Sequence, residues 1–164
     1  MTDWIDKIAS ALGASEKQRA NDYRVRLIED EVIQASGPKF IRDLSAACEV
    51  IAKELDEKLG GLVGGLVCSA TPNQIYVGTK MPRKASVTIV PDMQARDIKA
   101  TYEWNPGGPF AVVGSPHSET YRFRVDNVNG VYLMSEENEK FFQAERLASH
   151  ILQKTFKADL FRQD

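Results

Sequence analysis

The sequence predicts one α+β domain: N-terminal helices, an antiparallel sheet of about six strands in a meander, and a C-terminal helix packed on the sheet. Apolar residues recur at helical spacing up to residue 59, alternate with polar residues over 62–134, and return to helical spacing after residue 135. Because no helix-length segment separates the strand patterns, consecutive strands should be antiparallel neighbours. We expect a single domain over 1–164, with a helical extension at 1–36 that could dimerise and a core at 37–164.

Three helices are expected before the sheet. The first covers residues 2–12 and carries an apolar face, and Gly13 should end it. The second runs from Ser15 to about Ala35 and carries a second apolar seam. The third begins at Pro38, ends near Leu59, and has the strongest periodicity in the chain. The apolar sets of the first two are Trp4, Ile5, Ile8 and Leu12, then Val25, Ile28 and Val32.

Residues 60–65 read GGLVGG and raise the question of a phosphate-binding loop. Such a loop follows a strand and opens a helix, whereas this one follows a helix and leads into a strand. The Lys-Ser or Lys-Thr of a nucleotide loop is also missing, since Leu66 and Val67 follow. We therefore expect a structural role, with Gly60 or Gly61 ending the helix.

The alternating segments predict half-buried strands over 97–104 and 120–126, with shorter strands elsewhere. In the first, Ile98, Ala100, Tyr102 and Trp104 should face the core; in the second, Tyr121, Phe123 and Val125 should do so. Asn129-Gly130 is typical of a hairpin turn, and Ser135 should begin the last helix. The shorter strands are expected at 63–69, 74–79, 86–90, 110–113 and 131–134.

The composition and the lack of targeting signals argue against several classes of protein. The net charge of −2 argues against a nucleic-acid-coating protein. The first residues lack the basic start of a secretory signal, and no apolar run approaches the roughly 20 residues that a bilayer crossing needs. Cys48 and Cys68 lie in apolar patterns and are expected to be buried free thiols of a cytoplasmic protein.

No catalytic or metal-binding constellation is expected. The only histidines, His117 and His150, lie far apart, and His150 has Arg146 and Lys154 one turn to either side. A zinc site needs three or four suitably spaced ligands, and a serine nucleophile needs an oriented base. We therefore expect no metal, no cofactor and no catalytic residue.

Basic residues supply the remaining candidate sites. Lys99, Arg122 and Arg124 fall on the polar phase of their strands and could hold an anionic ligand with His117, since Arg offers a rigid donor fork. The simpler interpretation is cross-strand pairing with Asp97, Glu103 and Asp126. A basic loop at Lys80, Arg83 and Lys84 is the candidate for weak nucleic-acid binding.

The sequence does not identify a function. The favoured hypothesis is a non-catalytic cytoplasmic interaction or ligand-binding module, with an unknown protein or small anionic ligand as partner, that could form a homodimer through its N-terminal helices. One alternative is a small-molecule enzyme or carrier with a pocket between sheet and helices. Another is a weak nucleic-acid binder.

Overall fold

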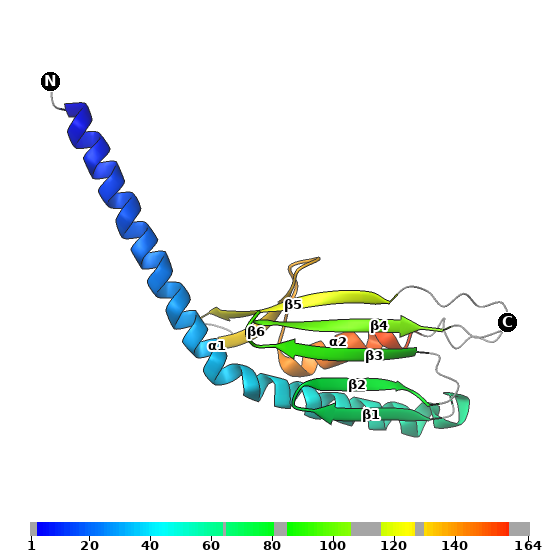
Figure 1. Ribbon diagram of the computed structural model, residues 1–164. Helices are drawn as coiled ribbons and strands as arrows, with labels where there is room; N and C mark the ends of the chain where they lie inside the picture. Colours follow the sequence, from blue (N-terminus) through cyan, green and yellow to red (C-terminus); the bar gives the residue numbers. More distant parts are fainter. Residues whose placement is uncertain (1–2, 64, 81–84, 106–115, 127–129, 158–164) are drawn as a thin grey trace.

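The protein is described by a computed structural model that covers residues 3–63, 65–80, 85–105, 116–126 and 130–157 (Figure 1). A long helix, α1 (Asp3–Val63), precedes the sheet, and α2 (Ala144–Thr155) follows it. The strands are β1 (Leu66–Thr71), β2 (Gln74–Thr79), β3 (Ala85–Asp92), β4 (Asp97–Trp104), β5 (His117–Asp126), β6 (Gly130–Ser135) and β7 (Phe141–Phe142).

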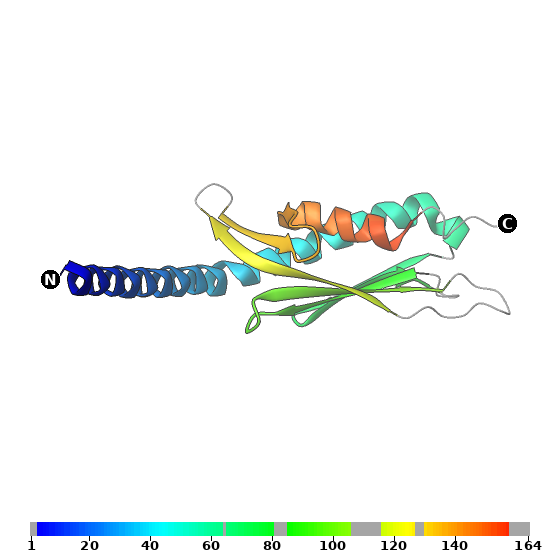
Figure 2. The same ribbon diagram turned by 90° about the horizontal axis from the view of Figure 1, so that it is seen from above.

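Within the described residues the sheet has seven strands in chain order, each antiparallel to the next. The second half of α1 and all of α2 lie on the same side of it (Figure 2). This confirms the predicted α+β class, the antiparallel meander and the packing of the last helix, with one strand more than expected. We call the helix-covered side the inner face and the opposite side the outer face.

The core lies between the inner face and the two helices. Its strand residues include Ile98, Ala100 and Tyr102 of β4, each fully buried, in the phase that alternation predicted. The buried side chains of α1 recur every four or seven residues, as a helix with one packed face requires. They are Ile33, Phe40, Leu44, Cys48 and Ala52, and α2 adds Ala144, Leu147, Ala148, Ile151 and Leu152.

The predicted breaks in the N-terminal region are wrong, because α1 is one continuous helix of 61 residues. Gly13 lies inside it, at a cost of about 1 kcal/mol that a long hydrogen-bonded helix tolerates. Pro38 also lies inside it, where a proline removes one backbone hydrogen bond and bends the helix. Figure 1 shows α1 bending where it reaches the sheet.

Tertiary contacts hold the helix together at this bend. A Cβ on Gly37 would overlap Cε of Met93, in the β3–β4 turn, so glycine permits close packing there. Gln34 donates from Nε2 to the Met93 carbonyl at 3.1 Å. Arg96 of the same turn forms an ion pair with Asp30. We call these contacts of α1 with the β3–β4 turn the joint; the predicted boundary at residue 36 falls within it.

Before the joint, α1 projects away from the sheet (Figure 1). Every residue from Asp3 to Ile28 is exposed except Gly13, which is intermediate, and Ile33 is the first buried apolar side chain. We call residues 3–32 the projecting half of α1. Across the described residues, no helix is both long enough and apolar enough to cross a membrane.

Two helix ends differ from expectation. α1 continues to Val63 rather than ending at Gly60 or Gly61, and the left-handed glycine is Gly65, with φ +98°. At the other end, Ser135 closes β6, and α2 begins only at Ala144. Phe141 and Phe142, predicted as helical, pair with β6 as β7. The predicted strand at 110–113 and Asn129 lie outside the described residues.

Candidate functional site

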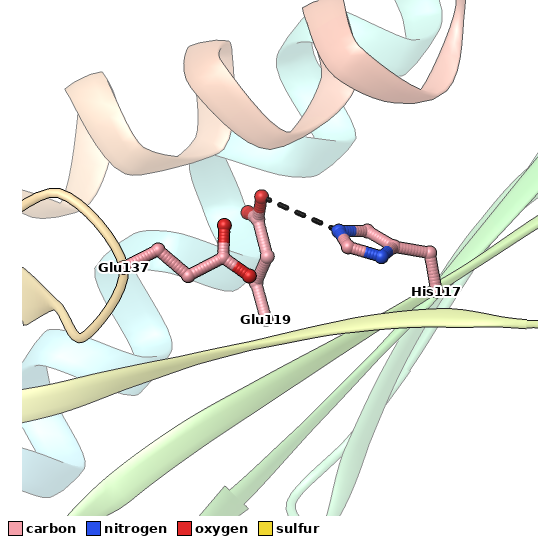
Figure 3. Close-up of side chains that lie close together, drawn as sticks. All are labelled: His117, Glu119 and Glu137. Atoms are coloured by element: carbon pink, nitrogen blue, oxygen red, sulfur yellow. Dashed lines mark ion pairs between the residues drawn. The ribbon is translucent and has the colours of Figure 1, made fainter.

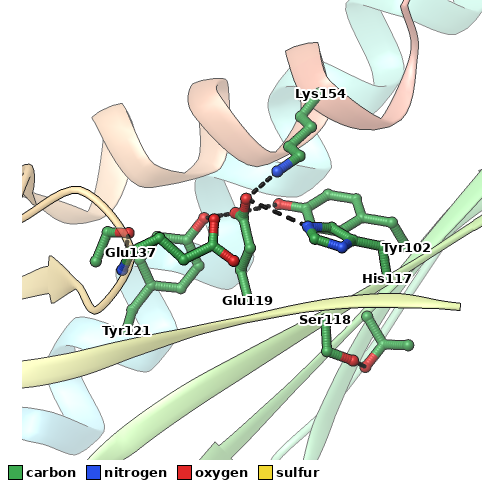
Figure 4. A network of polar contacts seen from close by, with 9 residues as sticks. Tyr102, His117, Ser118, Glu119, Tyr121, Glu137 and Lys154 are labelled. Carbon is green, nitrogen blue, oxygen red and sulfur yellow. Dashed lines mark hydrogen bonds and ion pairs between the residues drawn. The ribbon is translucent and has the colours of Figure 1, made fainter.

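A buried carboxylate is the most unusual feature of the inner face. Glu119 of β5 is only 6% exposed and lies opposite Ala100 of β4. Its Oε2 accepts a hydrogen bond from the Tyr121 hydroxyl at 2.6 Å and another from the Tyr102 hydroxyl at 3.4 Å (Figure 4). A buried charge is costly unless it is paired and hydrogen-bonded, so these donors offset part of the cost of burying the Glu119 carboxylate.

The counter-charge comes from α2. Lys154 donates from Nζ to Oε1 of Glu119, and its ammonium group lies 5.2 Å from the centre of the Tyr102 ring. Burial, and secondarily the positive charge of Lys157, lower the pKa of Lys154. One helical residue therefore neutralises the carboxylate and closes it off from the helix side.

His117 and Glu137 stand at the rim of this cluster (Figure 3). Nε2 of His117 is 3.7 Å from Oε1 of Glu119. One ligand-capable atom from each of His117, Glu119 and Glu137 lies within 4.8 Å of the others, and both rim residues are exposed. An imidazole and two carboxylates are ligands that divalent transition metals accept. A cation would nevertheless compete with the Lys154 ammonium group for Oε1.

The two tyrosines act as hydrogen-bond donors and not as bases. Burial raises the pKa of Tyr102 to about 12 and raises that of Tyr121 further. Both phenols therefore keep their protons at neutral pH. Lys154 contacts one oxygen of Glu119 and two hydroxyls contact the other, so proton transfer to this carboxylate would have to compete with those contacts.

Aromatic rings extend the cluster towards the end of β4. Trp104 stacks on Tyr102 with ring centres 5.5 Å apart and planes 5° from parallel. Its indole N–H donates to the Thr155 carbonyl at 3.0 Å, which ties the end of β4 to the end of α2. His117 lies 6.5 Å from the Trp104 ring, and Lys157 lies 5.4 Å from it. We call Tyr102, Trp104, His117, Glu119, Tyr121, Glu137 and Lys154 the Glu119 cluster.

The basic strand residues do not join this cluster. Lys99, Arg122 and Arg124 are exposed and alternate with inward-facing residues, so they lie on the outer face, as alternation predicted. Only His117 of the predicted ligand set lies on the inner face. The four residues therefore do not line one pocket between sheet and helices, and ligand binding through any of them stays a prediction.

Acidic side chains lie close to the predicted arginine residues. Nε of Arg122 lies 2.5 Å from Oε1 of Glu136, and Asp97 lies opposite Arg122 in the strand register. Arg122 and Arg124 also line a shallow hollow of about 340 Å³ with Glu136 and Glu139. Glu136 follows β6 and is not one of the acids expected for cross-strand pairing, of which Asp97 lies opposite Arg122; an anion bound here would have to compete with Glu136.

The predicted basic loop is described only in part. Lys80 is exposed at the end of β2, and its backbone N–H donates to the Gly65 carbonyl at 2.9 Å. Arg83 and Lys84 lie outside the described residues. Nucleic-acid binding through this loop stays a prediction.

An apolar hollow lies beside the joint. It has a volume of about 660 Å³ and runs between α1, the β1–β2 turn and the β3–β4 turn. Apolar residues dominate its lining: Pro38, Ile41, Ala46, Ala70, Pro72 and Met93. We call it the joint groove.

The projecting half of α1 is the third candidate. It exposes large apolar side chains at two places, separated by the polar segment 15–22. Trp4 is 63% exposed, and Ile28 is 55% exposed. The other exposed members are Ile5, Ile8 and Leu12 near the tip, and Tyr23, Val25 and Leu27 nearer the joint.

Comparisons with protein families, with curated proteins and with solved structures gave no match to this chain. Function must therefore be argued from the geometry alone.

The sequence reasoning missed Glu119, although a signal was present. Tyr121 and Phe123 were predicted to face the core, and the same alternation extended two residues back places Glu119 beside them. An acid in the buried phase of a strand requires a partner. That partner, Lys154, is 35 residues away on another element, so local patterns could not supply it.

Proposed function

We propose that the protein is a non-catalytic interaction module that forms a homodimer through the projecting half of α1. The observation that carries this proposal is the exposed apolar surface along a helix that contributes nothing to the core before Ile33. Single exposed apolar residues are ordinary, but large ones gathered along an unsupported helix indicate a binding surface. Most helical stability in proteins comes from packing, so pairing would stabilise this segment.

The Glu119 cluster supports the non-catalytic part of the proposal. Both oxygens of its carboxylate are engaged, and both phenols stay protonated at neutral pH. The two free cysteines support a cytoplasmic location, because oxidising compartments favour disulfides.

Sedimentation equilibrium over a range of concentrations tests the proposal. The wild-type chain should be a dimer at high concentration, and the double variant Val25→Glu/Ile28→Glu should be a monomer. Val50→Glu is the matched control, because Val50 is also exposed (58%) but lies on the packed half of α1. A wild-type chain that stays monomeric at every concentration would contradict the proposal.

The joint groove favours a second candidate, the binding of a small apolar molecule. Its volume of about 660 Å³ falls within the range of ligand sites, and its lining is mainly apolar. Native mass spectrometry of gently purified protein should then show a retained mass of ligand size. Ala46→Trp would fill the groove and remove that mass, whereas Val50→Trp would not. A bare chain in every preparation counts against this candidate.

A further inference from the structure

The spacing of residues along the projecting half specifies how two copies would pair. We infer that residues 4–32 form a parallel, in-register coiled coil with the same residues of a second copy. This inference rests on the proposed dimer and adds its orientation and its contact residues. It rests on the heptad spacing of apolar residues, on the exposure of those residues, and on the signs of the charges on either side of them.

A heptad with Trp4 at its first position gives nine seam positions, at the first and fourth residues of each repeat. They are Trp4, Lys7, Ala11, Ala14, Gln18, Asn21, Val25, Ile28 and Val32, of which six are apolar. The β-branched Val25 and Val32 occupy first positions, which favours two-stranded parallel coils. All the seam residues except Val32 are exposed in the single chain, and Val32 is half-buried.

Three seam residues are polar: Lys7 near the tip, which would meet Lys7 of the second copy at some cost, and Gln18 and Asn21 at the centre of the repeat. Gln18 and Asn21 would each meet the same residue of the second copy in a parallel, in-register pair. Amide side chains in that position can hydrogen-bond to one another, and they favour one register over shifted ones at some cost in stability. We therefore expect a reversible dimer of moderate affinity.

The charges that flank the seam are complementary in this orientation. In a parallel coil, the residue before each first position approaches the residue five places further along the other chain. Lys17 would meet Asp22 of the second copy, and Arg24 would meet Glu29 of the second copy. The two-fold symmetry repeats both pairs, which gives four attractive contacts.

The alternative pairings bring like charges together. An antiparallel coil on the same seam would place Lys17 beside Arg24 of the second copy. A parallel coil on the other apolar side of the helix, through Tyr23 and Leu27, would place Arg19 beside Arg24 of the second copy. Only the Val25–Ile28–Val32 seam in parallel orientation makes both flanking pairs attractive.

The packed domain leaves this seam accessible. Val32 is a seam residue, whereas Ile33, which is 3% exposed, faces the core. Successive helical residues point about 100° apart, so the sheet attaches roughly a quarter-turn from the seam. Two domains could therefore lie side by side at one end of the coil without occupying the seam.

A cysteine cross-link tests the orientation. Ala14 is a fourth-position seam residue, so in the full-length Ala14→Cys variant the two new thiols would face each other across a parallel coil. Mild oxidation should convert most of the chain to a covalent dimer on a non-reducing gel. Glu16→Cys is the matched control, because Glu16 lies on the outside of the coil. The unmodified chain, oxidised in the same way, accounts for Cys48 and Cys68.

Charge reversals test the same geometry independently. Lys17→Glu/Arg24→Glu should weaken the wild-type dimer by about ten-fold or more, because four attractive pairs become repulsive. Arg19→Glu/Arg26→Glu makes the same change in net charge off the seam and should have little effect. The dissociation constants come from sedimentation of the full chain.

Each negative result would overturn a different part of the proposal. A monomeric wild-type chain overturns the proposed function itself. A wild-type dimer in which Ala14→Cys does not cross-link, but a mixture of Ala14→Cys and Val25→Cys does, overturns the parallel orientation alone. A dimer that only Arg19→Glu/Arg26→Glu weakens overturns the choice of seam.

Discussion

Arg96 of the β3–β4 turn donates from a guanidinium nitrogen to Oδ2 of Asp30 at 3.0 Å, which joins the end of the projecting half to the sheet. Arg96 has φ 57°, a left-handed conformation that is uncommon for a residue with a side chain. Its carbonyl accepts the Phe123 N–H at 2.9 Å, so the same residue links the helix, the turn and β5.

Removing this link should loosen the direction of the projecting half without unfolding it. Arg96→Ala should cost about 0.5–1 kcal/mol, since both partners are partly solvent-exposed. Distances between spin labels on the tip of α1 and on the outer face should broaden. Lys39→Ala, which removes an exposed ion pair with Asp43 on the packed half of α1, is the control and should leave the distribution narrow. An unchanged distribution in Arg96→Ala would show that Gly37 and Gln34 hold the joint alone.

Glu119 and Lys154 should be strongly coupled in stability. Glu119→Gln leaves a partly buried ammonium group without its counter-charge and should cost about 3 kcal/mol in the free energy of unfolding. Lys154→Met should also destabilise, because Glu119 is almost fully buried.

The double variant Glu119→Gln/Lys154→Met should recover part of the loss, because it leaves no buried charge. Urea unfolding of all four proteins gives the coupling energy. Strictly additive losses would mean that the ion pair contributes no interaction of its own.

Stability should fall as the pH is lowered from about 6.5 towards 5 because of His150. Burial, and secondarily the charge of Lys140, lower the pKa of His150. In this window the unfolded chain therefore binds more protons than the folded chain, and stability rises with pH. The His150 ring packs 4.8 Å from that of Phe142 and would have to accept a charge there. His150→Gln should flatten the pH profile of urea midpoints, and a profile equally steep in the variant would contradict this assignment.

The two thiols should react at very different rates. Burial is the main cause that raises the pKa of Cys48 to about 12, and it also raises that of the half-buried Cys68. The thiolate is the reactive form, so alkylation at neutral pH should be slow at Cys68 and should require unfolding at Cys48. Peptide mass mapping after timed labelling distinguishes the sites. Labelling of Cys48 before Cys68 in the folded chain would be the contrary result.

The sheet was predictable from the sequence because its signals are local. Alternation correctly placed Ile98 and Tyr102 on the inner face and Arg122 on the outer face. Grouped strands correctly implied an antiparallel meander. The two-residue strand Phe141–Phe142 was missed, because two residues are too few to show an alternating pattern.

The continuity of α1 and the Glu119 cluster were not predictable in the same way. Gly37 and Pro38 are local stop signals, but contacts with Met93 and the β3–β4 turn override them. Glu119 obtains its charge partner from α2, and its hydroxyl donors come from β4 and β5. Such arrangements depend on the folded topology and leave no short-range pattern.

The chain contains two tryptophans, and each marks a different region. Trp4 is 63% exposed at the tip of α1, while Trp104 stacks within the Glu119 cluster. Intrinsic fluorescence therefore contains two separable signals. Trp4→Phe leaves emission that reports only on the cluster, and Trp104→Phe leaves emission that shifts to the blue when the two helices pair. The fluorescence of the two variants can therefore follow the tip of α1 and the Glu119 cluster separately, without an added label.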